Sequence, residues 1–434
     1  MTELTIEGEQ TSTPIQKPRL RLEYLDGLRG VSALYVMLFH FFMISSSIPL
    51  KSGAPRSFYL LWKSLHYFVF NFGHEAVVIF IVLSGYVLML PIVRSNDEKQ
   101  PGGTWNYIKR RANRILPPYY IALILAILID LAVVHLPAYN PSNWKDVMPI
   151  SMGAILSHFF LIYNFTPWAV KINAPMWSVA VEWQIYFFFP LLLLPMWRKA
   201  GILATVGTAF LFGNTVMIML LHSEYGWLVG EFSIGMLAAV IGFSKNLAIT
   251  RVREQWNWQA LTIFLGAITY FELAGQRQSL EKNHILRLLL VENWHLHLWS
   301  TGEWPTDVLV GLTASCFIIA STHILQNHQR ENRFLLFLQS SPMVKLGAFS
   351  YSLYLIHAPL LGLAQMAINS MHIGAIFALL IWVLLALPAI IGIAYLFYLA
   401  FERPFLPTHL RSKTISLLPN KPCEVPTTTS GSTK

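Results

Sequence analysis

Long apolar runs, separated by short polar segments, dominate the chain. A bilayer core is roughly 30 Å thick and a helix rises ~1.5 Å per residue, so about 20 apolar residues cross it. The pattern therefore predicts an all-α polytopic membrane protein with a single membrane domain. It predicts about ten transmembrane helices, at 28–48, 75–93, 115–136, 177–197, 200–221, 226–243, 257–274, 305–325, 346–368 and 374–400.

An eleventh apolar run, 149–165, is shorter and carries His158 and Asn164. It is either a span or a re-entrant segment. With a cytosolic N-terminus and 149–165 not crossing, most of the 31 lysines and arginines fall on the cytosolic side. Because cytosolic loops are enriched in Lys and Arg, we predict an integral multi-pass protein with both termini in the cytosol. The sequence does not choose between an endomembrane and the plasma membrane.

Composition agrees with a membrane protein. Charged residues make up 12% of the chain and apolar residues 55%, whereas soluble domains carry about 25% charged residues. The surplus of basic residues, 31 against 22 acidic, would suggest nucleic acid in a soluble protein. Here the topology accounts for most of it, so we expect the lipid bilayer as a partner and no nucleic acid.

The two ends of the chain are polar. Residues 1–24 lack the hydrophobic core of a signal peptide, and 405–434 are rich in Ser, Thr and Pro. We interpret both as disordered cytosolic tails that flank a membrane domain at 25–404. The sequence shows no metal-binding motif, and we predict no metal.

Arg29 and His40 are the first candidates for chemistry, in LDGLRGVSALYVMLFHFF. They are 11 residues apart, about three helical turns, so they share a helix face with an axial separation of about 16 Å. Ionisable groups inside a membrane span are costly and suggest function. A neutral imidazole is a candidate proton acceptor. The alternatives are an interfacial Arg29, paired with Asp26 or reaching for the headgroups, and a packing histidine.

Arg111 and Arg114 form an R-x-x-R pair on one helix face, in NYIKRRANRILPPYY. Guanidinium groups bind phosphate through paired donors. The competing interpretation is a plain cytosolic helix end. Pro117 and Pro118 are predicted to begin the third span.

Glu182 lies on an aromatic helix, MWSVAVEWQIYFFFP, and needs a partner there. It could orient His40, hold an arginine, bond a substrate hydroxyl, or form a structural ion pair. A further polar stripe occurs in FSYSLYLIHAP, where Ser350, Tyr354 and His357 share a face. Such a stripe can also join helices together. We assign Glu182 with His40 to catalysis. We expect substrate contacts from Trp177, Ser178, Tyr186, Tyr354 and His357.

In order and spacing, these pieces resemble the acyltransferase 3 family of integral membrane acyltransferases. The resemblance runs from about Leu25 to Pro404. It rests on LDGLRG with R-x10-H, on FIVLSGY at Phe80–Tyr86 and on R-x-x-R, followed by WSVAVEWQIYFFFPLL and FSYSLYLIHAP.

The resemblance implies a cytosolic acyl-CoA donor, with acetyl-CoA expected, and an acceptor hydroxyl. It implies that His40 is essential and that Arg29, Arg111 and Arg114 bind the donor. Acyl-CoA would be a co-substrate, with no permanently bound cofactor. Relatives with a short polar tail and a YLDGLRG-like run are common in filamentous fungi, and some accompany secondary-metabolite pathways. We therefore expect a hydrophobic or hydroxylated small-molecule acceptor, with a carbohydrate or a lipid as the alternative.

A proton-coupled transporter is the competing class. Ten spans, intramembrane Glu and His, and helices broken by Pro fit such a carrier. No inverted repeat is visible between the two halves, which counts against it.

Overall fold

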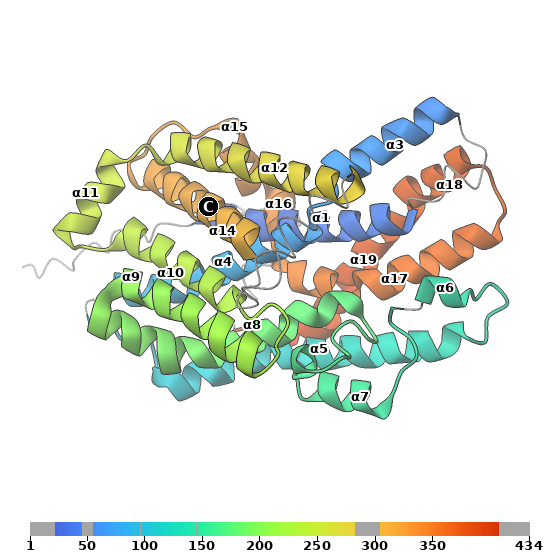
Figure 1. Cartoon of the computed structure of the whole chain (residues 1–434), viewed down its shortest axis with the longest axis horizontal. Helices are drawn as coiled ribbons and strands as arrows, with labels where there is room; N and C mark the ends of the chain where they lie inside the picture. Colours follow the sequence, from blue (N-terminus) through green and yellow to red (C-terminus); the bar gives the residue numbers. More distant parts are fainter. Residues whose placement is uncertain (1–21, 46–54, 96, 145, 283–303, 408–434) are drawn as a thin grey trace, which may run out of the picture.

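The structure is a computed structural model that describes residues 22–45, 55–95, 97–144, 146–282 and 304–407. The tails predicted at 1–24 and 405–434 lie almost wholly outside these residues. The described residues form helices and no strand (Figure 1). The helices are α1 (Glu23–Ser45), α3 (Arg56–Phe68), α4 (Gly73–Arg94), α5 (Gly103–Val133), α6 (Pro141–Trp144), α7 (Met152–Phe159), α8 (Trp177–Phe188), α9 (Leu194–Leu211), α10 (Leu228–Phe243), α11 (Leu247–Gln255), α12 (Trp258–Lys282), α14 (Trp304–Gln326), α15 (Arg333–Gln339), α16 (Ser341–Ala348), α17 (Ser350–Ser370), α18 (Ala375–Ile381) and α19 (Leu387–Phe397).

Short turns of other helix types join or extend these helices. They are the π-helical turns η3 (Phe189–Leu193), η4 (Phe212–Leu220), η7 (Trp382–Ala386) and η8 (Tyr398–Glu402), and the 3-10 turns η1 (Tyr163–Phe165), η2 (Ala174–Met176) and η9 (Arg403–Phe405). The turn η3 joins α8 directly to α9, and η7 joins α18 directly to α19.

The all-α polytopic class is confirmed, whereas the count of ten spans is not. In the described residues, seven helices are long and apolar enough to cross a membrane, and eight if the bent pair of α10 and α11 is one span. The run Ala174–Leu220 is one of these, although it contains two helices that meet at a break at Gly201 (φ 80°, ψ 177°).

Two local expectations can be checked directly. The segment 149–165 contains the eight-residue helix α7 and the short turn η1, and α7 would extend about 12 Å, which cannot cross a 30 Å core as a helix. Pro117 and Pro118 do not begin the helix that contains them. Both lie inside α5, which starts at Gly103 and places Arg111 and Arg114 on the same helix as the apolar run. Prolines are tolerated in membrane helices where neighbouring groups satisfy the freed backbone.

Helix α1 is the central element of the site. It packs against α4, α15, α16 and α17. Its LDGLRG run meets the backbones of α15 and α16 directly. A Cβ at Gly27 would collide with the Leu338 carbonyl oxygen, and one at Gly30 would lie 2.6 Å from the Gly347 amide nitrogen. Because only glycine leaves room for such close packing, the motif fixes where Arg29 enters the bundle.

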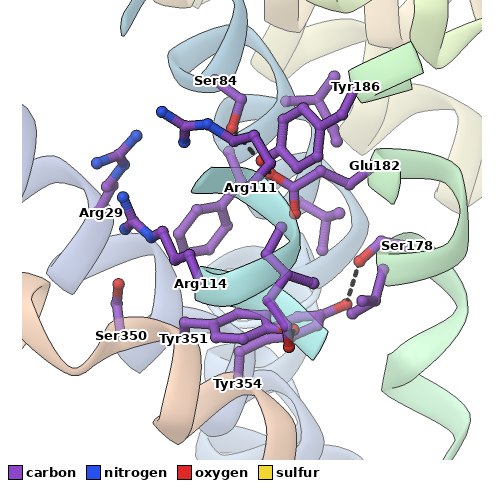
Figure 2. Close-up of a pocket in the computed structure, with 15 residues that line it drawn as sticks. Arg29, Ser84, Arg111, Arg114, Ser178, Glu182, Tyr186, Ser350, Tyr351 and Tyr354 are labelled. Carbon is purple, nitrogen blue, oxygen red and sulfur yellow. Dashed lines mark hydrogen bonds between the residues drawn. The ribbon is translucent and has the colours of Figure 1, made fainter. Parts of the chain in front are cut away.

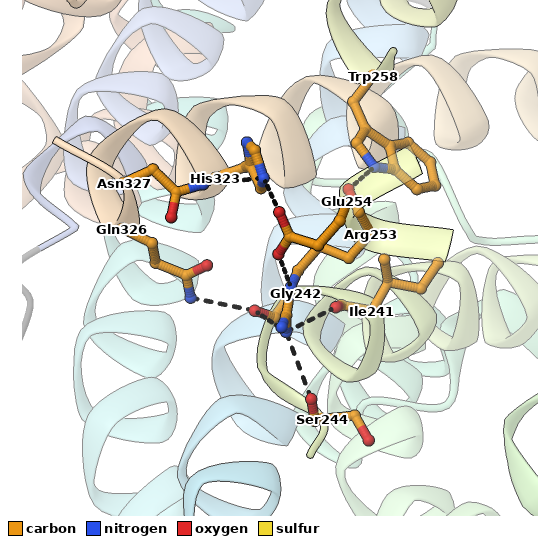
Figure 3. A network of polar contacts seen from close by, with 9 residues as sticks. All are labelled: Ile241, Gly242, Ser244, Arg253, Glu254, Trp258, His323, Gln326 and Asn327. Carbon is orange, nitrogen blue, oxygen red and sulfur yellow. Dashed lines mark hydrogen bonds and ion pairs between the residues drawn. The ribbon is translucent and has the colours of Figure 1, made fainter. Parts of the chain in front are cut away.

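A polar network ties α10, α11 and α14 together where α10 ends (Figure 3). Arg253 donates to the carbonyl groups of Gly242 (3.2 Å) and Ser244 (3.3 Å), which the helix end leaves without partners. The next residue, Glu254, lies 2.9 Å from Nε2 of His323 on α14. Gln326 adds a 3.0 Å bond to the Gly242 carbonyl. These contacts hold the sharp bend between α10 and α11.

The close approach of α1 to α15 yields a stability prediction. We expect Gly27→Ala to lower the free energy of unfolding by ~1–3 kcal/mol, because the methyl group forces two backbones apart. Gly207→Ala is the matched control, since a Cβ there meets no atom within 4 Å. Alanine at this helical position should be neutral or stabilising. Thermal unfolding of the purified protein in detergent measures both variants. Equal midpoints for wild type and Gly27→Ala would contradict the close approach.

Candidate functional site

A cavity lies between α1, α4, α5, α8 and α17 (Figure 2). It contains about 700 Å³ of empty space, part of it open to solvent. Its lining combines charged, hydroxyl and apolar side chains: Arg29, Val77, Phe80, Ile81, Ser84, Arg111, Arg114, Ile115, Ser178, Val179, Glu182, Tyr186, Ser350, Tyr351 and Tyr354.

Three guanidinium groups line this cavity. Arg29 comes from α1, and Arg111 and Arg114 come from one face of α5 (Figure 2). None of the three makes a hydrogen bond or an ion pair with any residue that the structure describes, and Nε of Arg111 is buried without a partner. Burying an unpaired cation is costly. The lining is therefore suited to an anion that supplies the missing acceptors.

Glu182 faces the same cavity. Its carboxylate accepts a hydrogen bond from Ser84 on α4 at 3.0 Å and another from the hydroxyl of Tyr186 one turn along α8. The Arg111 guanidinium lies 5.7 Å from the centre of the Tyr186 ring, within cation–π range. Glu182 thus orders one wall of the cavity and sits beside an arginine. No hydrogen bond joins it to His40 within the described residues, so the structure does not place it as the group that orients that ring.

Tyr354 forms another part of the wall. Its hydroxyl donates to the Pro175 carbonyl, so Ser178, 2.7 Å away, donates to the tyrosine oxygen. The Tyr354 ring centre lies 5.9 Å from that of His357, one turn further along α17. Tyr354 therefore lines the cavity and also contacts one residue of the histidine pair described next.

His40 is not part of the cavity lining and pairs with His357 instead. Nδ1 of His40 lies 2.8 Å from the Val36 carbonyl oxygen and 3.2 Å from Nε2 of His357. The two ring centres are 5.0 Å apart. His357 is fully buried, and its Nδ1 lies 2.8 Å from the Tyr354 carbonyl oxygen.

The contacts assign the protons of His40. A carbonyl oxygen only accepts, so the nitrogen that faces Val36 carries the hydrogen. A neutral imidazole has one N–H, which leaves the lone pair on Nε2 of His40. A nitrogen with a free lone pair is what a proton acceptor needs.

The structure brings most of the sequence-predicted residues together. Those that line the cavity are Arg29, Arg111, Arg114, Ser178, Glu182, Tyr186 and Tyr354. Trp177 does not line it and instead stacks beside His74 and Tyr225, with ring centres 5.6 and 4.1 Å away. Ser84 and Tyr351 are additions that helix periodicity alone did not single out, although Ser84 lies in FIVLSGY. Within the described ranges, no group of three or more His, Cys, Asp or Glu is placed to hold a metal ion.

Comparison with known proteins gives two findings. The family described as an acyltransferase domain, acyltransferase 3, matches residues 22–399. The O-acetyltransferase OatA of Staphylococcus aureus is 21% identical over 307 residues, with the same values in strains NCTC 8325 and COL. The match covers 67% of this chain and 46% of OatA, so the chain spans about half the length of the relatives it matches. No solved structure matches the chain.

The family match covers nearly all of the described helices and every residue that lines the cavity. The chain therefore belongs to the acyltransferase 3 family of integral membrane acyltransferases.

Proposed function

We propose that the protein transfers an acyl group, an acetyl group in the first instance, from acyl-CoA to a hydroxyl group of a small metabolite. The observation that carries this proposal is the group of three guanidinium side chains around one cavity, which make no hydrogen bond or ion pair with the described residues. They come from the N-terminal halves of α1 and α5, the ends predicted to be cytosolic, where acyl-CoA is found. The O-acetyltransferase name of the relatives supports an oxygen acceptor and an acetyl donor.

The donor would bind through its phosphates. Acyl-CoA carries several phosphate groups, and arginine provides paired donors that match phosphate oxygens. A hydrogen bond to a charged group contributes about 1.5–3 kcal/mol. Arg29, Arg111 and Arg114 would together supply most of the affinity, and the acyl arm would extend along the cavity toward Tyr354.

The chemistry would take place at His40. Nε2 removes the proton from the acceptor hydroxyl as the oxygen attacks the thioester carbonyl carbon. The carbon–sulfur bond then breaks, the proton passes from Nε2 to the CoA thiolate, and ester and CoA thiol leave. Each cycle returns His40 to its neutral form. General-base assistance of this kind contributes about 10²–10⁴-fold. Positioning of both reactants at one point adds to it.

The acceptor would meet the acyl group next to the histidine pair. His40 does not line the cavity, whereas Tyr354 lines it and contacts His357, so the Tyr354 side chain would have to move or make room for the thioester. Among the described residues, its hydroxyl is hydrogen-bonded to Ser178 and to the Pro175 carbonyl. A small metabolite in a secondary pathway is our first candidate for the acceptor, with a carbohydrate or a lipid as the alternative. Ser178, which is hydrogen-bonded to Tyr354, would offer a further polar contact there.

The first experiment seeks the acceptor. Membranes containing the protein are incubated with radiolabelled acetyl-CoA and a panel of hydroxylated metabolites, sugars and lipids, and O-acetylated products are separated. We expect a labelled ester that membranes without the protein do not form. Uptake of panel compounds into vesicles, independent of acetyl-CoA and without any ester, would instead favour the transporter class.

The second prediction concerns His40. We expect His40→Ala to abolish acyl transfer, because it removes the proposed proton acceptor, while protein amount and membrane insertion stay as in wild type. His135→Ala is the control, since His135 is exposed in the turn after α5 and far along the chain from the cavity lining. Full activity of His40→Ala would contradict the assignment of His40 as the proton acceptor.

The third prediction concerns the arginines on α5. We expect Arg111→Ala combined with Arg114→Ala to raise KM for acetyl-CoA by about 10-fold or more for each lost contact, with a smaller effect on kcat. Arg110→Ala is the matched control, because Arg110 is exposed on the same helix and donates to the Pro101 carbonyl outside the cavity. An unchanged KM in the double variant would contradict a role in donor binding. The two arginines would then be the basic residues of a plain cytosolic helix end.

A further inference from the structure

The two imidazole rings of His40 and His357 form a contact that joins α1 to α17 inside the bundle. Both nitrogens of His357 are accounted for. Nδ1 lies 2.8 Å from the Tyr354 carbonyl oxygen and 3.1 Å from that of Leu353, and Nε2 lies 3.2 Å from Nδ1 of His40. The side chain has no exposed surface. His357 therefore has no polar atom left for a substrate, in contrast to its predicted role in substrate binding.

The contacts of the pair determine which nitrogen of each ring carries a hydrogen. Nδ1 of His357 faces two carbonyl oxygens of its own helix and must carry the hydrogen. In a neutral ring, Nε2 then has the lone pair and accepts the N–H of His40. The second acceptor of that N–H is the Val36 carbonyl, 2.8 Å away. A proton on Nε2 of His357 would point at the hydrogen of His40 and break the contact.

We propose that His357 is a positioning residue that holds the His40 ring with its lone pair on Nε2 and stabilises the charge that the ring acquires during catalysis. This inference rests on the proposed function. Val36 alone would orient one N–H but would leave the ring held by a single acceptor. His357 adds a second acceptor whose own orientation is locked by two carbonyl groups. It does the work that a carboxylate does in many catalytic triads, without bringing a negative charge into the membrane.

During the reaction His357 would keep its own proton throughout. His40 receives the acceptor's proton on Nε2 and becomes an imidazolium, whose Nδ1–H is shared between Val36 and His357. Hydrogen bonds strengthen when one partner is charged, so the contact stabilises the charged ring more than the neutral one. The benefit falls on the chemical step and not on donor binding, because His357 does not line the cavity.

Two amide substitutions test the proposal, because they differ in reach. His357→Gln can bring an amide oxygen to the place of Nε2 and keep an acceptor for His40. His357→Asn reaches only the place of Nδ1 and cannot. Each full-length variant is purified and its thermal unfolding compared with wild type. Kinetics are then measured with acetyl-CoA and the acceptor that the panel identifies. His357→Leu repeats the test with an apolar side chain if the Asn variant does not fold.

We expect kcat to fall by about 10-fold to 100-fold in His357→Asn. This factor corresponds to the loss of one hydrogen bond to a charged group in the transition state. In His357→Gln most of kcat should remain, and KM for acetyl-CoA should stay within about twofold of wild type in both variants. A wild-type kcat in His357→Asn or His357→Leu would overturn the proposal. An equal loss of kcat in His357→Gln and His357→Asn would also overturn it. If those results come with an inactive His40→Ala, the inference about His357 fails and the proposed function stands. If the wild type forms no ester, the proposed function fails.

Discussion

An excess of positive charge within the helical bundle is the constraint on which the site depends. Three guanidinium groups and one carboxylate line the cavity, and the guanidinium groups find no hydrogen-bond partner among the residues that the structure describes. Such an arrangement is unfavourable until an anion fills it. It also demands exact placement of the helices that carry the charges. The contact of Gly27 and Gly30 with the backbones of α15 and α16 supplies that placement for Arg29.

The arginines line the cavity, whereas neither histidine of the pair does. Tyr354 lines the same cavity as the arginines and contacts His357, which pairs with His40. A ligand that joins both has to carry its anionic groups well away from its reactive group, as acyl-CoA does. Glu182 belongs to the charged part, where it holds Ser84 and Tyr186. Its place in the structure is that of an organiser of the cavity wall next to Arg111, apart from His40.

The sequence predicted features that depend on one helix and missed those that depend on two. Helical spacing placed Arg111 beside Arg114, and the apolar runs located the helices. The pairing of His40 with His357 was not predicted, because the residues are 317 positions apart and periodicity does not say which helix faces meet. For the same reason the partners of Glu182 stayed open. The start of α5 was misplaced because proline is a strong stop signal in water and a weaker one in a packed membrane helix.

Affinity for the phosphate-bearing part of the donor tests the central claim most directly. Isothermal titration of the purified wild-type protein with CoA, and separately with pantetheine, compares a ligand that has the phosphates with a fragment that lacks them. If the arginine-lined cavity receives the donor, CoA binds and pantetheine binds at least about 100-fold more weakly, because the charge-assisted contacts are lost. Equal affinity for the two compounds would contradict the proposed role of the cavity.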